Sequence, residues 1–364
     1  MTIGFVAEPY EEHGASGMGY FIRELLVALL KEKQGHDFVV YTSRPMHKEF
    51  VPGTYRTVRI PQNFVAKLWW FFRMKKEVDV LLFVVPLLPL VVPRSIRSIA
   101  ICQELANLKF PPEHVSEKIF AFIRDRLLMP TCFARAEKIV AASEATKEDI
   151  IRFYGVPSEN ITVVPDGFQD LIPFAPAALP INEAQKPYFF FAGKVKPRKN
   201  VHGIVSAFIL FKKRTGADCK LLIAGSYGGG YYERIRQKLK NTGLLSEVYF
   251  LGYVTSPHLY TLYKNALACV YPSLNEGFGM PILEAMNLGT PVITSSISSL
   301  PEVAGGAAIL VDPYNAEDIS RAMEKLCSDP ALRADLIQKG LVRAKLFSWA
   351  KTADAYLDLL SLVG

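Results

Sequence analysis

Two glutamates with a glycine-rich turn between them are the residues of this chain best suited to hold a ligand. Glu276 and Glu284 flank the stretch Gly-Phe-Gly-Met-Pro, with seven residues between the two carboxylates. The apolar run 266–271 before them has the pattern of a buried strand. Pro281 suits the first turn of a helix, where its missing N–H costs nothing. We therefore predict a strand, a sharp turn and a helix that begins near Met280.

The turn has the composition of a phosphate-binding loop. A helix N-terminus offers free N–H groups and the positive end of its dipole, and both attract a diphosphate. Gly277 and Gly279 let the backbone approach a ligand closely, and Phe278 and Met280 complete the loop. An ordinary strand-turn-helix with solvated glutamates is the alternative, because short motifs often match by chance. The spacing of the two carboxylates favours the binding site.

The two glutamates would have different roles. Glu284 falls one turn into the predicted helix, so its carboxylate can accept hydrogen bonds from hydroxyls beside the phosphates. An acidic residue does this for ribose in dinucleotide-binding folds. Glu276 lies on the other side of the turn, where a sugar would sit. The segment therefore predicts a pocket for a nucleotide sugar.

A second group of candidate residues is cationic. Arg198 and Lys199 follow the apolar run 188–192 and Gly193. A guanidinium can fork onto phosphate oxygens, and an ammonium acts as a point charge. Breaking a sugar–phosphate bond leaves extra negative charge on the diphosphate, which such prepositioned cations stabilise. The alternative is a solvated turn, and the glycine beside the pair favours the phosphate site.

The sequence lacks the patterns typical of a metal site. No two aspartates are two positions apart, and the six histidines show no spacing such as His-x3-His. We therefore expect metal-independent chemistry that survives EDTA. No cofactor is expected besides the nucleoside-diphosphate sugar, which would be the donor substrate.

Together these motifs resemble those of a known family. The Glu-x7-Glu pattern continues into residues 285–293 and 300–305, and the cationic pair lies within the stretch Phe191–Asn200. These segments are similar to the retaining GT-B glycosyltransferases of family 4, also called glycosyl transferases group 1. The resemblance is close over residues 187–313. It is looser in the first half, at residues 17–20, 101–105 and 163–167.

The resemblance implies an activity. Enzymes of this kind transfer a hexose with retention of its anomeric configuration, and the leaving phosphate itself takes the acceptor proton. Glu276 would then hold the hydroxyls of the sugar instead of acting as a covalent nucleophile. The Pro-Arg-Lys-Asn loop resembles that of enzymes that build polysaccharide from mannose or related sugars. The expected acceptor is a glycan or lipid-linked precursor in surface polysaccharide synthesis, such as lipopolysaccharide.

The first half of the chain offers a second candidate anion site. Glycines recur in the stretch 14–19, between the first apolar run and a helix expected near Tyr20. In the family the matching loop lies against the donor phosphate and sugar, which makes Gly17 and Gly19 candidates. His13 is a candidate on the acceptor side, although a lone histidine in a polar loop is more often solvated.

One position departs from the family pattern. Members usually carry a histidine followed by an acid where this chain has Gln103 and Glu104. A glutamine can donate and accept hydrogen bonds but cannot become charged. Either the substrate differs or activity is lost, so a non-catalytic GT-B scaffold or nucleotide-binding protein is the alternative function. A GT-B phosphorylase or epimerase is a third, because a fold does not fix the chemistry.

Short apolar runs alternate with helical stretches along the whole chain, which indicates parallel sheets with crossover helices. We expect an α/β protein of the GT-B class, with two doubly wound Rossmann-like domains facing across a cleft. The predicted strands are 3–7, 38–41, 79–84, 99–102, 138–142 and 161–164 in the first half, and 188–192, 220–224, 248–251, 267–271, 291–294 and 308–311 in the second.

The domain boundaries follow from composition. We predict an N-terminal, acceptor-side domain over 1–168 and a nucleotide-sugar-binding domain over 187–346. Residues 169–186 between them contain three prolines among alanines, which is typical of a stiff linker. In the final segment, 347–364, one helical face gathers Phe347, Ala350, Ala353, Leu357 and Leu360. The resemblance implies that this helix packs back on the N-terminal domain.

Composition limits the partners and the compartment. With 42 basic and 35 acidic residues the net charge is +7, which favours anionic partners. No nucleic-acid-binding module is recognisable, so nucleic acid is not expected. The five cysteines are scattered and odd in number, as in reduced proteins, and the N-terminus opens directly on a strand without a signal peptide. We expect a cytoplasmic protein.

The segment 64–76 has two interpretations of equal weight. It combines five aromatic residues with four cations, a composition that suits a helix lying in a membrane interface. Its apolar positions also wrap most of the helix circumference, which fits a buried core helix equally well. The membrane interpretation predicts peripheral contact with an anionic bilayer, on the inner face of the membrane.

Overall fold

The structure is a computed structural model that describes most of the chain. It describes residues 1–8, 17–32, 35–46, 49, 51–74, 77–84, 92–93, 95–111, 119, 121–178 and 187–363. The chain divides into two compact units. The first comprises Met1–Gly167 with Phe347–Gly364, and the second comprises Phe168–Leu346.

The first unit is built on a seven-stranded parallel sheet. Its strand order, β3-β2-β1-β4-β5-β6-β7, reverses direction between β1 and β4. This reversal defines a doubly wound sheet. The strands are β1 (Thr2–Val6), β2 (Asp37–Thr42), β3 (Arg56–Arg59), β4 (Val80–Val84), β5 (Arg97–Cys102), β6 (Lys138–Ala141) and β7 (Ile161–Val163).

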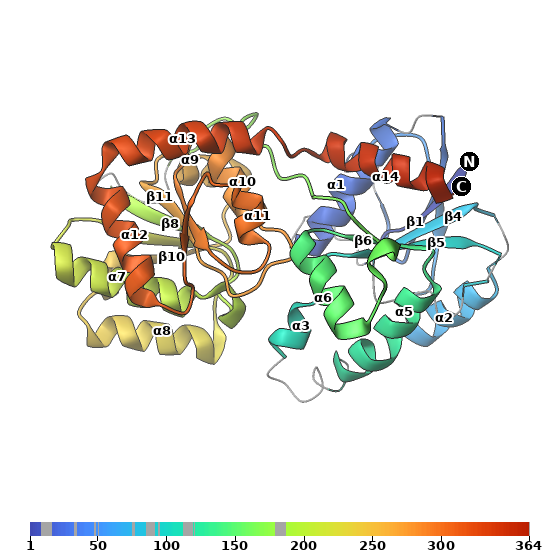
Figure 1. The fold of residues 1–364 in the computed structure, drawn as a ribbon, viewed down its shortest axis with the longest axis horizontal. Helices are drawn as coiled ribbons and strands as arrows, with labels where there is room; N and C mark the ends of the chain where they lie inside the picture. The colour runs from blue at the N-terminus through green and yellow to red at the C-terminus, as the bar shows by residue number, and fades with distance from the viewer. Residues whose placement is uncertain are drawn as a thin grey trace. The chain divides into compact units, whose positions relative to one another are not determined.

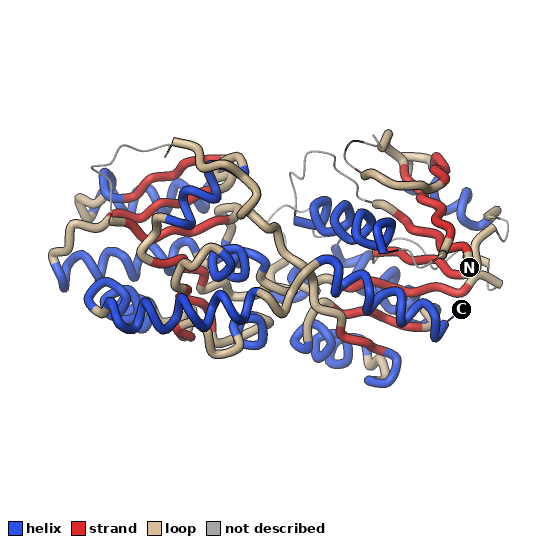
Figure 2. The backbone as a smooth tube through the Cα atoms, turned by 90° about the horizontal axis from the view of Figure 1, so that it is seen from above, coloured by secondary structure: helices blue, strands red, loops and turns tan. Residues whose placement is uncertain are grey.

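Helices cover both faces of this sheet (Figure 2). Alternate residues of each strand point to opposite faces, so Ile3 and Phe5 join one core cluster and Val6 joins the other. The first cluster lies under α1 (Gly17–Glu32) and α14 (Trp349–Val363), which lie side by side (Figure 1). The second lies under α2 (Phe64–Phe72), α5 (Met129–Arg135) and α6 (Glu144–Tyr154). The described part of the unit also contains the short helix α3 (Ala106–Lys109), the π-helix Arg124–Leu128 and the 3-10 turn Ser158–Asn160.

The second unit has the same plan with a six-stranded parallel sheet. Its order is β10-β9-β8-β11-β12-β13, with the reversal between β8 and β11. The strands are β8 (Tyr188–Ala192), β9 (Lys220–Ala224), β10 (Val248–Gly252), β11 (Ala268–Tyr271), β12 (Val292–Ser295) and β13 (Ile309–Val311). The helices are α7 (Val201–Thr215), α8 (Gly229–Asn241), α9 (Ser256–Lys264), α10 (Met280–Asn287), α11 (Leu300–Ala304), α12 (Ala316–Ser328) and α13 (Pro330–Ala344).

The prediction of two doubly wound parallel sheets is confirmed, with local differences. Every predicted strand is present, and β3 was not predicted because its Arg-Thr-Val-Arg sequence at the sheet edge leaves three of four residues exposed. Helix α1 begins at Gly17 and not near Tyr20. Helix α14 begins at Trp349, which leaves Phe347 outside it, and Ala350 is exposed instead of packed.

The first part of the predicted linker is bonded to the second unit. Gln169 donates to the Ser256 hydroxyl at 3.0 Å, and Asp170 accepts from the Asn287 amide at 3.0 Å. The Thr261 hydroxyl donates to the Ala177 carbonyl at 3.0 Å. Residues 179–186 lie outside the described residues, and the linker stays a prediction.

Helix α2 has one buried face and one exposed apolar face. One face is buried: Phe71 is fully enclosed, and Lys67 forms a buried ion pair at 2.8 Å with Glu8, just after β1. The opposite face is exposed and apolar, with 72% of Val65, 56% of Trp69 and 59% of Phe72 accessible. No described helix is long and apolar enough to cross a membrane.

Candidate functional site

Two loops meet at the reversal point of the second unit's sheet. One follows β8 and runs through Gly193 to a 3-10 turn, Pro197–Lys199. The other follows β11 and runs to Gly279, the N-cap of α10. Because β8 and β11 are adjacent and parallel, their carboxyl ends place both loops at one edge of the sheet. This is where doubly wound sheets bind ligands.

A buried carboxylate joins the two loops. Lys199 Nζ donates to both carboxylate oxygens of Glu276, at 2.7 and 2.8 Å, and Arg198 donates to Oε2 at 3.3 Å. The Tyr271 hydroxyl accepts from Lys199 at 2.5 Å and donates to Glu276 Oε1 at 3.0 Å. Only 7% of Glu276 is exposed. The group of two cations and one carboxylate therefore carries a net positive charge.

The pKa values fit an ionised carboxylate held by cations. Burial raises the pKa of Glu276, but the attraction of Lys199 and then of Arg198 outweighs it, and the pKa lies below its usual value. Burial raises the pKa of the Tyr271 hydroxyl well above its usual value, with a contribution from the Glu276 charge. Tyr271 therefore stays protonated and can donate to the carboxylate.

Backbone contacts fix the cationic turn against the second loop. Asn200 adopts a left-handed conformation, with φ 57°, and its side chain donates to the Pro272 and Pro313 carbonyls at 3.1 and 2.6 Å. The Leu274 N–H donates to the Arg198 carbonyl at 2.8 Å, and the Arg198 guanidinium donates to the Asn275 carbonyl at 3.1 Å. Arg198 is thus held by its backbone carbonyl and by its guanidinium.

Two serines after β12 hold the backbone of the glutamate. Ser298 Oγ accepts from the Glu276 N–H at 3.0 Å and donates to the Glu276 carbonyl at 2.7 Å. Ser299 Oγ lies 3.0 Å from the same carbonyl and 2.8 Å from that of Phe278. Neither these serines nor Tyr271 were predicted as site residues from the sequence. Their available signal is position: each stands at or just after the carboxyl end of a strand beside the motif.

The glycine turn is shaped for close approach. Gly279 has φ +115°, and an added Cβ would lie 2.7 Å from Leu300 Cδ2, so both its conformation and its surroundings require glycine. Gly277 and Phe278 are buried, and Met280 at the start of α10 is partly exposed. Gly193, with φ +154°, packs against Gly225, where a Cβ would meet the Gly193 carbonyl oxygen at 2.1 Å.

Glu284 lies in α10, in a different environment from Glu276. Its carboxylate accepts a hydrogen bond from the Tyr263 hydroxyl at 3.2 Å, and its side chain is half-buried. Burial raises the pKa of Glu284 to about 7, and the Tyr263 hydrogen bond lowers it only in part. Glu284 is thus poised to change charge near neutral pH, whereas Glu276 is not.

The candidates of the first unit lie at the carboxyl edge of its own sheet. Gln103 follows β5, and its side-chain amide donates to Asp166 Oδ1 at 3.2 Å. Glu104 follows it and is partly buried. Gly17 and Gly19 form the first turn of α1, with Gly17 exposed and Gly19 buried. His13 and the rest of its loop lie outside the described residues.

Asp166 is a further buried acid, and it was not predicted as a site residue from the sequence. It is 2% exposed, and burial raises its pKa to about 8, with the Gln103 hydrogen bond acting in the opposite direction. In this environment an uncharged glutamine cannot compensate a carboxylate charge as a cation could. Burial therefore favours the protonated form of Asp166 in the folded protein.

The last two features of the site residues concern metal binding and the cysteines. Among the residues that the structure describes, no group of three or more His, Cys, Asp or Glu side chains could hold a metal ion. Metal independence stays a prediction. The five cysteines are all free thiols, four of them buried and Cys327 partly exposed.

The raised pKa of Asp166 predicts a pH-dependent stability. The folded pKa of about 8 exceeds the unfolded value of about 3.9. The contribution is therefore complete below pH 4 and is lost as pH rises to about 8. We expect the melting temperature of Asp166→Asn to fall less than that of the wild type between pH 5 and about 8.5. Asp358→Asn, on the exposed face of α14, is the control, and equal slopes for Asp166→Asn and wild type would contradict the assignment.

Comparison with known families places both halves of the chain. Residues 176–343 match the model of the glycosyl transferases group 1, and residues 15–169 match that of glycosyltransferase family 4. The first match contains Glu276, Arg198 and Lys199, and the second covers most of the N-terminal half, so two separate family models recognise the two halves.

Relatives agree with these matches. An O-antigen chain mannosyltransferase B of Escherichia coli is 35% identical over 231 residues, which are 61% of this chain and 60% of that protein. A serotype-specific mannosyltransferase WbdA of the same species is 28% identical over 72% of this chain and 33% of its own length. The match thus spans between a third and three fifths of the length of these relatives.

Solved structures share the fold over nearly the whole chain. A sucrose-phosphate synthase of Thermosynechococcus elongatus superposes with a TM-score of 0.73 at 21% identity, and covers 100% of this chain and 99% of its own. Anabaena HepE in complex with UDP and glucose gives a TM-score of 0.74 at 16% identity, with 99% of each chain covered. From the two family matches and the GT-B fold, we conclude that this protein belongs to the group 1 glycosyl transferases of family 4.

Proposed function

We propose that this protein is a retaining hexosyltransferase that uses a nucleoside-diphosphate sugar and needs no metal ion. The observation that carries the proposal is the buried Glu276 carboxylate held by Lys199 and Arg198. It lies beside the glycine-opened N-terminus of α10, at the sheet edge where nucleotides bind. A cationic pair and a helix N-terminus together suit a diphosphate.

Each part of the site has a role in the proposed reaction. The phosphates would be bound by Arg198, Lys199 and the backbone of Gly277 and Gly279. Glu284 would accept hydrogen bonds from the ribose hydroxyls. As phosphates draw the cations away from the carboxylate, Glu276 becomes able to accept hydrogen bonds from the sugar.

The proposed chemistry is displacement at the anomeric carbon. The bond from that carbon to the diphosphate oxygen breaks, and a bond to the acceptor oxygen forms on the same face. The acceptor proton passes to an oxygen of the leaving phosphate. Lys199 and Arg198 stabilise the charge that develops on the diphosphate, where prepositioned cations are most effective. Glu276 already accepts three charged or phenolic donors, which disfavours a role as nucleophile.

The sugar and acceptor are proposed from the relatives. The proteins named above as O-antigen chain and serotype-specific mannosyltransferases support mannose or a related hexose as the transferred sugar. They also support a glycan or lipid-linked acceptor in surface polysaccharide synthesis. The solved HepE complexes with UDP and with UDP-glucose support a nucleotide-sugar donor of this general kind.

One observation keeps the second candidate function in view. Gln103 stands where the family usually has histidine, and its amide is engaged with Asp166 at 3.2 Å. A protein that bound a nucleoside diphosphate without transferring or hydrolysing any sugar would be a non-catalytic GT-B scaffold. An assay that measures nucleotide binding and sugar transfer on the same variants separates these two functions.

The proposal predicts a division of labour between Glu284 and Lys199. With a panel of nucleoside diphosphates and their sugars, in EDTA, one series should raise the melting temperature. Glu284→Ala should weaken its binding at least about tenfold with a smaller effect on turnover, because it removes a ribose acceptor. Lys199→Ala should lower turnover at least about a hundredfold, because it acts on the leaving group. Binding should also weaken below about pH 7, where Glu284 becomes protonated.

The control is Glu233→Ala, an exposed glutamate on α8 of the same unit, which should change neither quantity. Equal losses of binding and turnover in Glu284→Ala and Lys199→Ala would contradict the division of labour. Failure of every nucleotide to stabilise the protein would contradict the donor proposal itself, and loss of transfer in EDTA would contradict metal independence.

We further propose peripheral contact with an anionic membrane, at the cytoplasmic face. Helix α2 exposes Val65, Trp69 and Phe72 on one side, at i, i+4 and i+7. The segment before α5 exposes Phe122 and Leu127, and both helices pack on the same face of the sheet. Exposed Arg73 and Arg126 flank these apolar residues, and cations beside an apolar surface suit anionic lipids.

The membrane proposal predicts a charge-dependent and apolar contribution to binding. The wild type should sediment with vesicles containing phosphatidylglycerol more than with phosphatidylcholine alone, and salt should weaken this binding. The double variant Phe72→Ser, Phe122→Ser should bind about tenfold more weakly. Leu362→Ser, an 84% exposed apolar residue on α14, should have no effect. Equal binding by the double variant and wild type would contradict this surface.

A further inference from the structure

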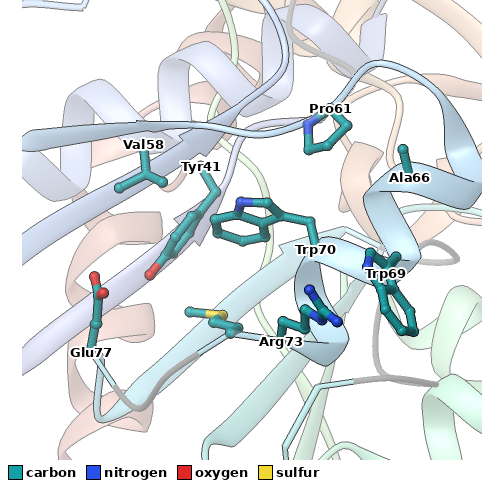
Figure 3. A pocket seen from close by; sticks show the side chains of 9 residues that line it. Tyr41, Val58, Pro61, Ala66, Trp69, Trp70, Arg73 and Glu77 are labelled. Carbon is teal, nitrogen blue, oxygen red and sulfur yellow. The ribbon is translucent and has the colours of Figure 1, made fainter.

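A pocket of about 480 Å³ lies between α2 and the edge of the first unit's sheet. Its walls come from β2, β3 and α2, and Figure 3 shows the indole of Trp70 at its centre. The volume falls within the range of about 300–1,000 Å³ typical of small-molecule sites. The lining residues are Tyr41, Val58, Pro61, Ala66, Trp69, Trp70, Arg73, Met74 and Glu77.

A buried hydroxyl of this pocket lacks a partner. Tyr41 is 1% exposed, and its hydroxyl makes no hydrogen bond to any described residue. Figure 3 shows this hydroxyl turned toward the side of the pocket where Glu77 lies. An unsatisfied buried polar group costs stability and is rare in native structures. A ligand that hydrogen-bonds to Tyr41 would remove this cost.

The rest of the lining combines aromatic surface with polar groups at the rim. The rings of Trp70 and Tyr41 meet edge to face with centroids 5.6 Å apart, and Trp69 is 56% exposed beside them. The Arg73 guanidinium lies over the Trp69 ring, 4.4 Å from its centroid. Glu77 pairs with Arg56 at 2.7 Å, so both signs of charge are present around the pocket.

We propose that this pocket binds neutral hexose units of a glycan, and in particular of the acceptor chain. Sugar rings present C–H faces that pack on indoles and hydroxyls that pair with Tyr41, Arg73 and Glu77. An acyl chain would leave the Tyr41 hydroxyl unpaired. Arg56 and Arg73 disfavour an organic cation, and Glu77 disfavours a phosphate. Identifying the glycan as the acceptor rests on the proposed function, whereas sugar binding at the pocket does not.

The position of the pocket indicates holding and not reaction. Tyr41 and Val58 place the pocket beside β2 and β3, the two strands at one outer edge of the sheet. Gln103 and Asp166, in contrast, follow the carboxyl ends of β5 and β7. A glycan bound here would raise the affinity for long acceptors through a second contact. The pocket should therefore affect the KM for long acceptors and leave kcat unchanged.

Tryptophan fluorescence reports on the pocket directly. The protein has three tryptophans, two of which line the pocket, while Trp349, the first residue of α14, is partly buried against the core cluster under α1. Titration of the protein with mannotetraose and with maltotetraose should change this emission for at least one of the two sugars. Trp70→Phe should remove most of the change.

The decisive variant is Tyr41→Phe, which deletes only the unpaired hydroxyl. Its melting temperature should be equal to or above that of wild type, because no hydrogen bond is lost on the protein side. Its affinity for the oligosaccharide should fall about three- to tenfold. Tyr356→Phe is the matched control, since Tyr356 is also 1% exposed with an unpaired hydroxyl but lies in the other core cluster. It should bind the oligosaccharide as wild type does.

Three results would overturn the proposal. They are no change with either oligosaccharide up to about 10 mM, equal affinities for Tyr41→Phe and wild type, or a stronger response to tetramethylammonium than to sugar. The nucleotide thermal-shift assay on the same samples separates this failure from that of the proposed function. Nucleotide binding without sugar binding refutes the pocket alone, and sugar binding without nucleotide binding refutes the donor site alone.

Discussion

The contact between Lys199 and Glu276 is the interaction on which the candidate site depends. A carboxylate that is 7% exposed is stable as an anion only when cations and hydrogen bonds replace its water. Lys199, Arg198 and Tyr271 supply them from two loops that are far apart in sequence. Separating these loops would leave a buried charge without compensation, so the contact fixes the geometry of both.

The rest of the second unit supports this contact. The parallel pairing of β8 with β11 places the loops side by side. Asn200 and Ser298 take left-handed conformations, which are uncommon for residues other than glycine. Asn200 holds the cationic turn to Pro272 and Pro313, and Ser298 holds the backbone of Glu276. Local strain and buried hydrogen bonds of this kind are typical of functional sites that must be ordered before a ligand arrives.

Sequence patterns predicted the elements better than the pairing among side chains. Buried parallel strands are continuous apolar runs, so β8 and β11 were readily found, whereas the exposed edge strand β3 was not. The motif residues Arg198, Lys199 and Glu276 were also found, but the sequence assigned the cations to phosphates and the carboxylate to sugar. Their mutual pairing depends on strand order, which spacing along the chain does not encode.

Other parts of the site were beyond local patterns for similar reasons. Asp166 is recognised as a candidate only from its burial and from its hydrogen bond with Gln103. The two residues are 63 positions apart in the sequence. In the sequence, Tyr41 is an ordinary strand residue. Only the packing of α2 against β2 shows that its hydroxyl lies at a pocket without a partner among the described residues. Such properties arise from tertiary packing, so a single sequence carries no direct signal for them.

The most direct test of the central claim is the affinity for pyrophosphate of the variant Glu276→Gln. If the carboxylate competes with phosphates for Lys199 and Arg198, the neutral amide should raise pyrophosphate affinity at least about tenfold by calorimetry, while sugar transfer is lost. Glu284→Gln, away from the cations, should leave pyrophosphate affinity unchanged. Unchanged or weaker pyrophosphate binding by Glu276→Gln would show that the cations do not exchange the carboxylate for phosphate, and would contradict the proposed donor site.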